Sequence, residues 1–197
     1  MPSPYLNRAL FLVLPWVLAG CIGGTTPPSQ FYLLEPITAA EPPGTGEKHV
    51  IALAPVRIPQ YVDRPQMVTA TGKNAYQLNE LNRWAERLDD NIARVLAQNL
   101  GLLVPADLVL LNATGRSKQA KLRVAVNILE FHIGPQAQAQ VAAQWTIARG
   151  EETALARSFT CHEPASASDY RVMAAALNAC LDRLSRELAD ALRPLAE

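Results

Sequence analysis

Residues that perform catalysis or bind metals are scarce in this sequence. Its 197 residues include three cysteines and three histidines, and the histidines are scattered at His49, His132 and His162. No Gly-x-Ser-x-Gly elbow, His-Glu-x-x-His motif or glycine-rich phosphate loop is present. Cys161 adjoins His162, but neighbouring residues of a strand point to opposite faces and cannot readily converge on one atom. We therefore predict that the protein is not an enzyme and has no metal or cofactor.

An excess of charge of either sign is also absent. The sequence contains 18 basic and 18 acidic side chains, and the basic ones form no block. Nucleic acids and anionic lipid headgroups are attracted by strongly basic surfaces. The charge balance therefore argues against both of them as electrostatic partners.

Long hydrophobic runs are missing too. Residues 9–19 form an apolar run of 11 residues that is interrupted by Pro15. A membrane-spanning helix needs about 20 residues, so this run is too short to cross a bilayer. It follows Arg8 and ends in Leu18-Ala19-Gly20-Cys21, which is the layout of a secretory signal peptide. We predict that residues 1–20 are this signal peptide.

The cysteine that directly follows the small residues makes the cleavage site resemble a lipobox. In bacterial lipoproteins this cysteine receives a diacylglycerol on its sulfur and a third acyl chain on the new amino terminus. Each buried methylene contributes about 0.8 kcal/mol, so three chains hold a protein permanently on a membrane. We predict lipidation of Cys21. The alternative is a cleaved soluble protein with a chance cysteine.

The chain that follows the lipidation site divides into a tether and a domain. Residues 22–30 consist mainly of glycine, proline and small polar residues, so residues 21–30 form a lipidated cysteine and a flexible tether. At about 3.3 Å per extended residue, the tether reaches roughly 30 Å from the bilayer. Residues 31–197 are long enough to bury their own core as a single periplasmic domain.

Most of this domain is predicted to be strands. Apolar residues alternate with polar ones in residues 122–128 and 139–147, which is typical of half-buried antiparallel strands, and Gly134-Pro135 predicts a hairpin turn between them. A loop is expected at residues 39–48. Further strands are expected at residues 31–35, 50–56, 67–71, 75–78, 108–111 and 152–161.

A helical period begins at Leu81. Apolar residues then recur every three or four positions until near Gly101, which predicts an amphipathic helix with Trp84 in its apolar stripe. Asp90 and Arg94 are spaced to form a favourable ion pair on its polar side.

A second amphipathic helix closes the chain. It begins at the capping pattern Ser166-x-x-Asp169, and its polar side carries charges of both signs. Mixed charge favours packing on the sheet over lying on a membrane surface. The predicted fold is therefore an α+β domain, in which a mostly antiparallel sheet has two amphipathic helices packed on one face.

Residues 57–66 form the most distinctive polar segment. Two prolines six positions apart exclude a long helix there, and Tyr61, Asp63 and Arg64 lie between them. One interpretation is that Asp63 and Arg64 satisfy the backbone of the turn and each other. The other is that the turn binds a partner, because binding residues concentrate on loops held by a rigid scaffold.

Two cysteines remain if Cys21 carries lipid. Cys161 and Cys180 both fall on apolar faces of their predicted elements and lie in an oxidising compartment. A disulfide between them would close a loop of about 20 residues and contribute roughly 3 kcal/mol. The alternative is two separately buried thiols.

Two segments carry a resemblance to a known family. The first is residues 55–68, and the second is Arg83-Trp84-Ala-Glu86-Arg-Leu88 running into residues 95–100. With the strand after the tether and a carboxy-terminal helix opening at Tyr170, they resemble the auxiliary lipoproteins of ABC-type lipid transport systems, the PqiC or YmbA-like family. One departure is Arg87, which stands where the family usually has proline in Trp-Ala-Glu-Pro-Leu.

The resemblance implies a non-enzymatic outer-membrane lipoprotein that works beside a periplasmic MCE-domain protein and helps to move lipid between two membranes. Ile22 is not the aspartate associated with inner-membrane retention, which favours the outer membrane. The turn at residues 57–66 is then expected to help bind the MCE-domain partner. The rival functions are an envelope-integrity lipoprotein that binds another ligand and, from a different class, a periplasmic hydrolase. The number of subunits is not set by the sequence, so a homo-oligomer stays open.

Overall fold

The computed structural model describes residues 27–38, 49–111 and 115–196. The predicted signal peptide, the lipidation site at Cys21 and the expected loop at residues 39–48 lie outside these ranges. None of the helices in the described residues is long and apolar enough to cross a membrane.

The described strands form one sheet. Its order is β1-β4-β3-β6-β2-β5, while β7 pairs with β6 and β8 pairs with β7. The strands are β1 Gln30–Tyr32, β2 His49–Leu53, β3 Gln66–Gly72, β4 Ala75–Trp84, β5 Ala106–Leu110, β6 Leu122–Gly134, β7 Gln138–Arg149 and β8 Glu152–Pro164. The long pairings, β3–β4 and β6–β7–β8, are antiparallel, whereas the short pairings of β1, β2 and β5 are parallel. The predicted α+β class with a mostly antiparallel sheet is confirmed, and the parallel pairings that make the sheet mixed are short.

The β6–β7 hairpin turns where the sequence predicts. The turn is closed by a hydrogen bond of 3.1 Å from the Ala137 amide to the Gly134 carbonyl. A bulge between Ile128 and Glu130 shifts the alternation of β6. After the bulge, Phe131 still faces the core, so His132 points to the opposite face of the sheet.

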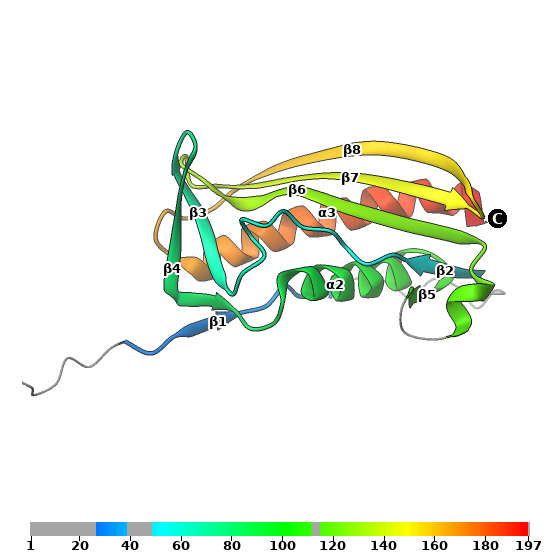
Figure 1. Ribbon diagram of the computed structural model, residues 1–197, viewed down its shortest axis with the longest axis horizontal. Coiled ribbons are helices and arrows are strands. Elements are labelled where there is room, and N and C mark those ends of the chain that lie inside the picture. The colour runs from blue at the N-terminus through cyan, green and yellow to red at the C-terminus, as the bar shows by residue number, and fades with distance from the viewer. Residues whose placement is uncertain (1–26, 39–48, 112–114, 197) are drawn as a thin grey trace, which may run out of the picture.

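Two helices pack against this sheet. They are α2 Leu88–Leu103 and α3 Tyr170–Ala196. Helix α3 packs on β6, β7 and β8, and α2 lies beside it in contact with α3 and β5. Figure 1 shows β6, β7 and β8 running lengthwise over α3, with the β3–β4 hairpin standing across one end of the molecule.

Helix α2 begins seven residues later than the sequence pattern predicts. Residues 81–84 belong to β4, where Trp84 pairs with Tyr32 of β1 and its amide donates to the Pro65 carbonyl at 2.7 Å. Trp84 is buried as expected, but from a strand. The spacing of Leu81, Trp84 and Leu88 fits a helix, yet pairing on both sides of β4 outweighs this local preference.

The expected Asp90–Arg94 ion pair is also wrong. Asp90 lies 3.6 Å from Arg87, and Arg94 reaches back to Glu86 at 2.7 Å. The later helix start explains this change, because it places Asp90 in the first turn beside Arg87.

Helix α3 is capped by a different residue of the predicted motif. The Asp169 carboxylate accepts hydrogen bonds from the amides of Arg171 at 2.9 Å and Val172 at 3.3 Å. The Ser166 hydroxyl accepts from the amides of Ser168 and Asp169 and so shapes the turn that precedes the helix. Asp169 is therefore the N-cap, which Ser166 was expected to be.

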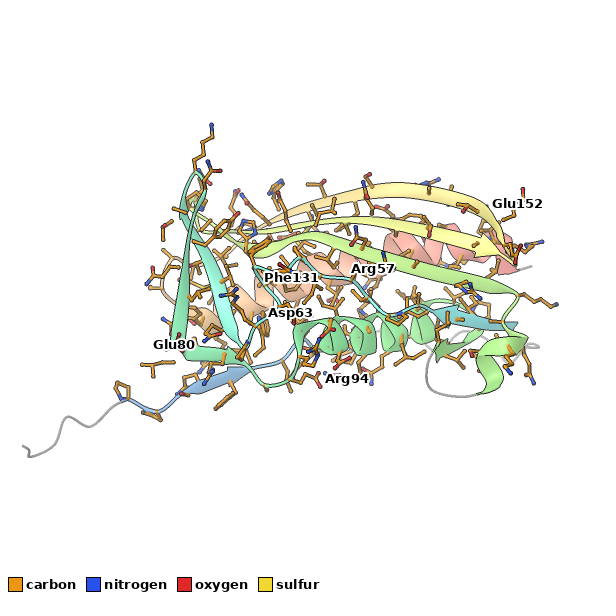
Figure 2. The ribbon with its side chains drawn as sticks, in the orientation of Figure 1. Arg57, Asp63, Glu80, Arg94, Phe131 and Glu152 are labelled. Carbon is orange, nitrogen blue, oxygen red and sulfur yellow. A yellow bond between two sulfur atoms is a disulfide. The ribbon has the colours of Figure 1, made fainter. Side chains whose placement is uncertain are left out.

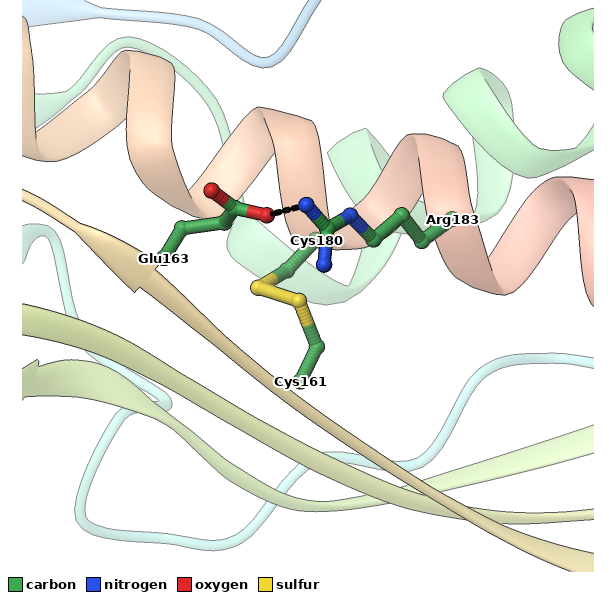
Figure 3. The surroundings of a disulfide bond; sticks show 4 residues. All are labelled: Cys161, Glu163, Cys180 and Arg183. Atoms are coloured by element: carbon green, nitrogen blue, oxygen red, sulfur yellow. Dashed lines mark ion pairs between the residues drawn. A yellow bond between two sulfur atoms is a disulfide. The ribbon is translucent and has the colours of Figure 1, made fainter.

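A disulfide joins β8 to α3. Cys161 and Cys180 are bonded with their Cα atoms 5.6 Å apart, so the structure holds the first of the two cysteine alternatives (Figure 3). Arg183 and Glu163 form an ion pair beside the bond. Closing a loop between cysteines 19 positions apart contributes about 3 kcal/mol in the chain-entropy model.

Three asparagines fix the segment that follows β1. Asn91 bonds the amide of Leu34 at 2.8 Å, and Asn99 bonds the amide of Ile37 at 2.8 Å. Asn178 of α3 accepts from the Glu35 amide at 2.7 Å. These bonds hold the amino-terminal segment of the domain against both helices.

Candidate functional site

The turn at residues 57–66 is held by backbone contacts on both of its sides. Before the turn, the Arg57 amide donates to Val126 of β6 at 3.2 Å, and the Arg57 carbonyl accepts from Ile128 at 2.8 Å. Within the turn, the Val62 amide donates to the Pro59 carbonyl at 3.1 Å. The described backbone bonds of this turn are thus made by other backbone groups, and they leave the Asp63 and Arg64 side chains facing solvent.

Tyr61 faces the sheet rather than solvent. Its hydroxyl accepts from the Phe131 amide at 3.3 Å and lies 2.9 Å from Nδ1 of His132. The direction of the hydrogen bond between Tyr61 and His132 is set by the tautomer of the imidazole. The Tyr61 ring also packs on Tyr76, with 5.1 Å between centroids.

Burial sets the protonation of this cluster. It raises the pKa of Tyr61 to about 12. It also lowers the pKa of His132, against the opposing effect of nearby Glu130. Both groups are therefore neutral at pH 7, and together they fasten the turn to β6.

Asp63 and Arg64 lie on the other side of the turn. With Pro65 and residues 84–88 they line an open pocket of about 350 Å³. Glu86 and Arg87 add charges of both signs to the same pocket, and Arg87 lies 3.7 Å from Asp63. Figure 2 shows Asp63 near the first turn of α2.

The pocket can form ion pairs and hydrogen bonds with a ligand of mixed charge. Its side chains are carboxylates, guanidiniums and apolar groups, and the buried His132 belongs to the separate cluster around Tyr61. Within the described part of the chain, no group of three or more His, Cys, Asp or Glu residues could hold a metal ion. The geometry fits binding to another protein segment.

The structure thus divides the predicted site residues into two groups. Asp63 and Arg64 share one pocket, whereas Tyr61 positions the turn from its opposite side. Cys21 lies outside the described residues. His162 is exposed on β8 while Cys161 is buried in the disulfide, so the two point apart.

Arg87 is the site residue that the sequence analysis missed. It has a φ of −57°, which lies in the range that proline imposes. Arg87 thus has a proline-like φ, and its guanidinium lies 3.7 Å from Asp63 and 2.8 Å from Asp89. The sequence feature that could have pointed to Arg87 is its replacement of the proline in the usual Trp-Ala-Glu-Pro-Leu.

Comparison with known proteins gives the class of protein. The model of a family of lipoproteins that serve transport systems matches residues 32–189, which include the sheet from β2 to β8 and most of α3. The chain belongs to this family, the ABC-type transport auxiliary lipoprotein components. Among curated proteins no match was found.

Solved structures share the fold. An uncharacterized protein is 19% identical, with a TM-score of 0.71, over 84% of this chain and 99% of its own. Protein XCC0632 from Xanthomonas campestris is 15% identical, with a TM-score of 0.67, over 83% of this chain and 94% of its own. At these identities the likeness shows the architecture alone.

Proposed function

We propose that this protein is the outer-membrane auxiliary component of an ABC/MCE-type intermembrane lipid transport system. Acyl chains on Cys21 hold it to the periplasmic face of the outer membrane, where it binds a periplasmic MCE-domain protein without catalysing a reaction. The family match over residues 32–189 is the observation that carries this proposal. The lipobox and Ile22 support the outer membrane as its location.

The pocket beside the turn is the proposed docking surface for the partner. Asp63, Arg64 and Arg87 present charges of both signs on a turn that Tyr61 fastens to the sheet. The ion pair between Asp63 and Arg87, with 3.7 Å between its charged atoms, is exposed and therefore weak, so it can be exchanged for a pair with a partner at little cost.

A protein segment suits this pocket better than a lipid chain. Four charged side chains border its volume of about 350 Å³. Placing an acyl chain against these groups would remove water from charges without giving them a new partner, which is unfavourable. A loop or helix end with its own charges would replace the lost water.

Co-purification tests this proposal. The acylated protein would be isolated in mild detergent as wild type and as the double variant Asp63→Ala/Arg64→Ala. We expect an MCE-domain protein to accompany the wild type and to be reduced in the double variant, with acylation unchanged. Tyr61→Phe belongs in the same series, because it loosens the turn without changing the charge of the pocket.

The control is another exposed aspartate and arginine pair. Asp190 and Arg193 form an ion pair on α3, away from the turn, so Asp190→Ala/Arg193→Ala should leave partner recovery unchanged. Equal recovery with the Asp63/Arg64 variant would remove the turn as the docking site. Failure to recover any MCE-domain protein with wild type would remove the transport role.

A further inference from the structure

The amino-terminal strand carries an exposed apolar face. Phe31 is 63% exposed, the highest value for a large hydrophobic side chain in the described residues, and Leu33 two positions later is 46% exposed. Burial alternates along this segment, with Tyr32 half-buried and Leu34 buried. Phe31 and Leu33 therefore project from the same side of the chain, away from the core.

A cation lies beside this face. Phe31 is in register with Arg83 of β4 in a parallel pairing, which places both side chains on the same side of the sheet. Nε of Arg83 is buried and has no hydrogen-bond partner among the described residues. Because this atom is closed to solvent, it is not open to a ligand, and the exposed side chains on this side are those of Phe31 and Leu33.

The segment that carries this face is rigidly attached to the domain. The Tyr32 hydroxyl donates to Asn82 at 2.9 Å, and the Tyr32 carbonyl accepts from the Ala85 amide at 2.9 Å. Asn91 bonds both backbone groups of Leu34. A contact made by Phe31 and Leu33 would therefore fix the orientation of the whole domain.

We propose that Phe31 and Leu33 form a second membrane contact, separate from the acyl anchor. The two apolar side chains enter the headgroup boundary of the bilayer. The inference rests on the proposed lipid anchor, because only nine residues separate Cys21 from Phe31 and they span at most about 30 Å. Aromatic and aliphatic side chains bind this zone readily, without a basic surface.

The contact would also place the docking pocket near the membrane. Tyr32 bonds Ala85, and Ala85 lines the pocket that contains Asp63 and Arg64. A partner in that pocket would then meet the protein close to the bilayer surface.

Quenching of tryptophan fluorescence tests this inference. The acylated protein would be placed in vesicles of phosphatidylethanolamine and phosphatidylglycerol with brominated acyl chains, as wild type and as Phe31→Trp. Outside the predicted signal peptide, the native tryptophans are Trp84 and Trp145, both buried, so wild type supplies the background. We expect the added tryptophan to shift its emission to shorter wavelength and to be quenched, and the quenching should persist in high salt because the contact is apolar.

Leu129→Trp is the matched control. Leu129 is 42% exposed on β6, which does not pair with β1. Quenching at position 31 but not at position 129 supports the proposal. Equal quenching, or none, overturns it, and so does a concentration-dependent blue shift without quenching, which would mean that a second copy or another protein covers the face.

A variant without the lipidated cysteine tests the membrane contact independently of the acyl anchor. In Phe31→Ser/Leu33→Ser, made in a chain that also carries Cys21→Ser, binding to plain vesicles should fall by roughly tenfold or more relative to Cys21→Ser alone. Unchanged binding overturns the membrane contact even if the anchor is correct. Loss of wild-type protein from vesicles with Cys21 intact would instead overturn the anchor.

Discussion

The side chain of Asn91 bonds both backbone polar groups of Leu34, 57 positions earlier in the chain. Its Oδ1 accepts from the Leu34 amide at 2.8 Å, and its Nδ2 donates to the Leu34 carbonyl at 3.2 Å. Asn91 is fully buried, so these two bonds are shielded from solvent. In this way one residue of α2 performs the role of a neighbouring strand for the segment after β1.

Removing this side chain should destabilise the domain strongly. Asn91→Ala leaves the Leu34 amide without a partner and its carbonyl with only the long bond of 3.5 Å from Arg94, which costs about 1 to 3 kcal/mol of unfolding free energy. Urea denaturation of the purified protein measures the change. Asn178→Ala removes a similar bond to Glu35 at an exposed position and should cost less than about 1 kcal/mol, so equal losses would contradict this account.

His132 should make stability depend on pH. Burial lowers its pKa in the folded protein, whereas the unfolded chain has a pKa near 6.5. The stabilisation is therefore complete above pH 6.5 and is lost as the pH falls through the lower folded pKa. Denaturation between pH 7.5 and about 5 should show declining stability in wild type.

Substitutions at the histidines of β6 and β8 distinguish this cause from a general effect of acid. His132→Gln should flatten the decline, while His162→Gln, at an exposed position of β8, should leave it unchanged. An identical slope in wild type and His132→Gln would show that another group is responsible.

Loss of the Cys161–Cys180 bond should weaken the domain without abolishing its sheet. The double variant Cys161→Ala/Cys180→Ala is expected to lose about 3 kcal/mol of unfolding free energy. Intact mass after alkylation under denaturing conditions, with and without prior reduction, tests the bond itself. Two thiols that react without reduction would show that the mature protein lacks it.

Acylation should depend on a single cysteine. Cys21→Ala removes the sulfur that takes the diacylglycerol, so the variant should carry no lipid and leave the membrane fraction. Mass spectrometry and membrane fractionation measure the two effects. The prediction fails if wild type carries no lipid or if the variant stays fully membrane-bound.

Local periodicity predicted the elements that depend on local pattern. The alternating apolar residues of β6 and β7 place Val124, Trp145 and Ile147 in the core as expected. Residues 81–84 were misread because a spacing of three and four fits a helix, whereas their pairing with β1 and β3 is a property of distant sequence.

The residues of the docking pocket also come together through contacts between distant parts of the sequence, which local patterns do not predict. The sequence marked Asp63 and Arg64 as a polar cluster, but nothing local joins Asp63 to Arg87, which lies 24 positions away. Asn91 and Asn99 likewise look like unremarkable polar residues of a helix until their distant backbone partners are known. Hydrophobic periodicity predicts which face of a helix is buried. The hydrogen-bond partner of a buried asparagine side chain can be identified only from the folded structure.

The bond between Glu35 and Asn178 has a consequence for the order of folding. It joins residues 143 positions apart, so this bond forms only after the carboxy-terminal helix has been made and has packed. The bonds that Asn91 and Asn99 make to the same segment need only α2, so they can form earlier. The contact with Asn178 is therefore the one that links the start of the domain to the end of the chain, and it completes the attachment of this segment.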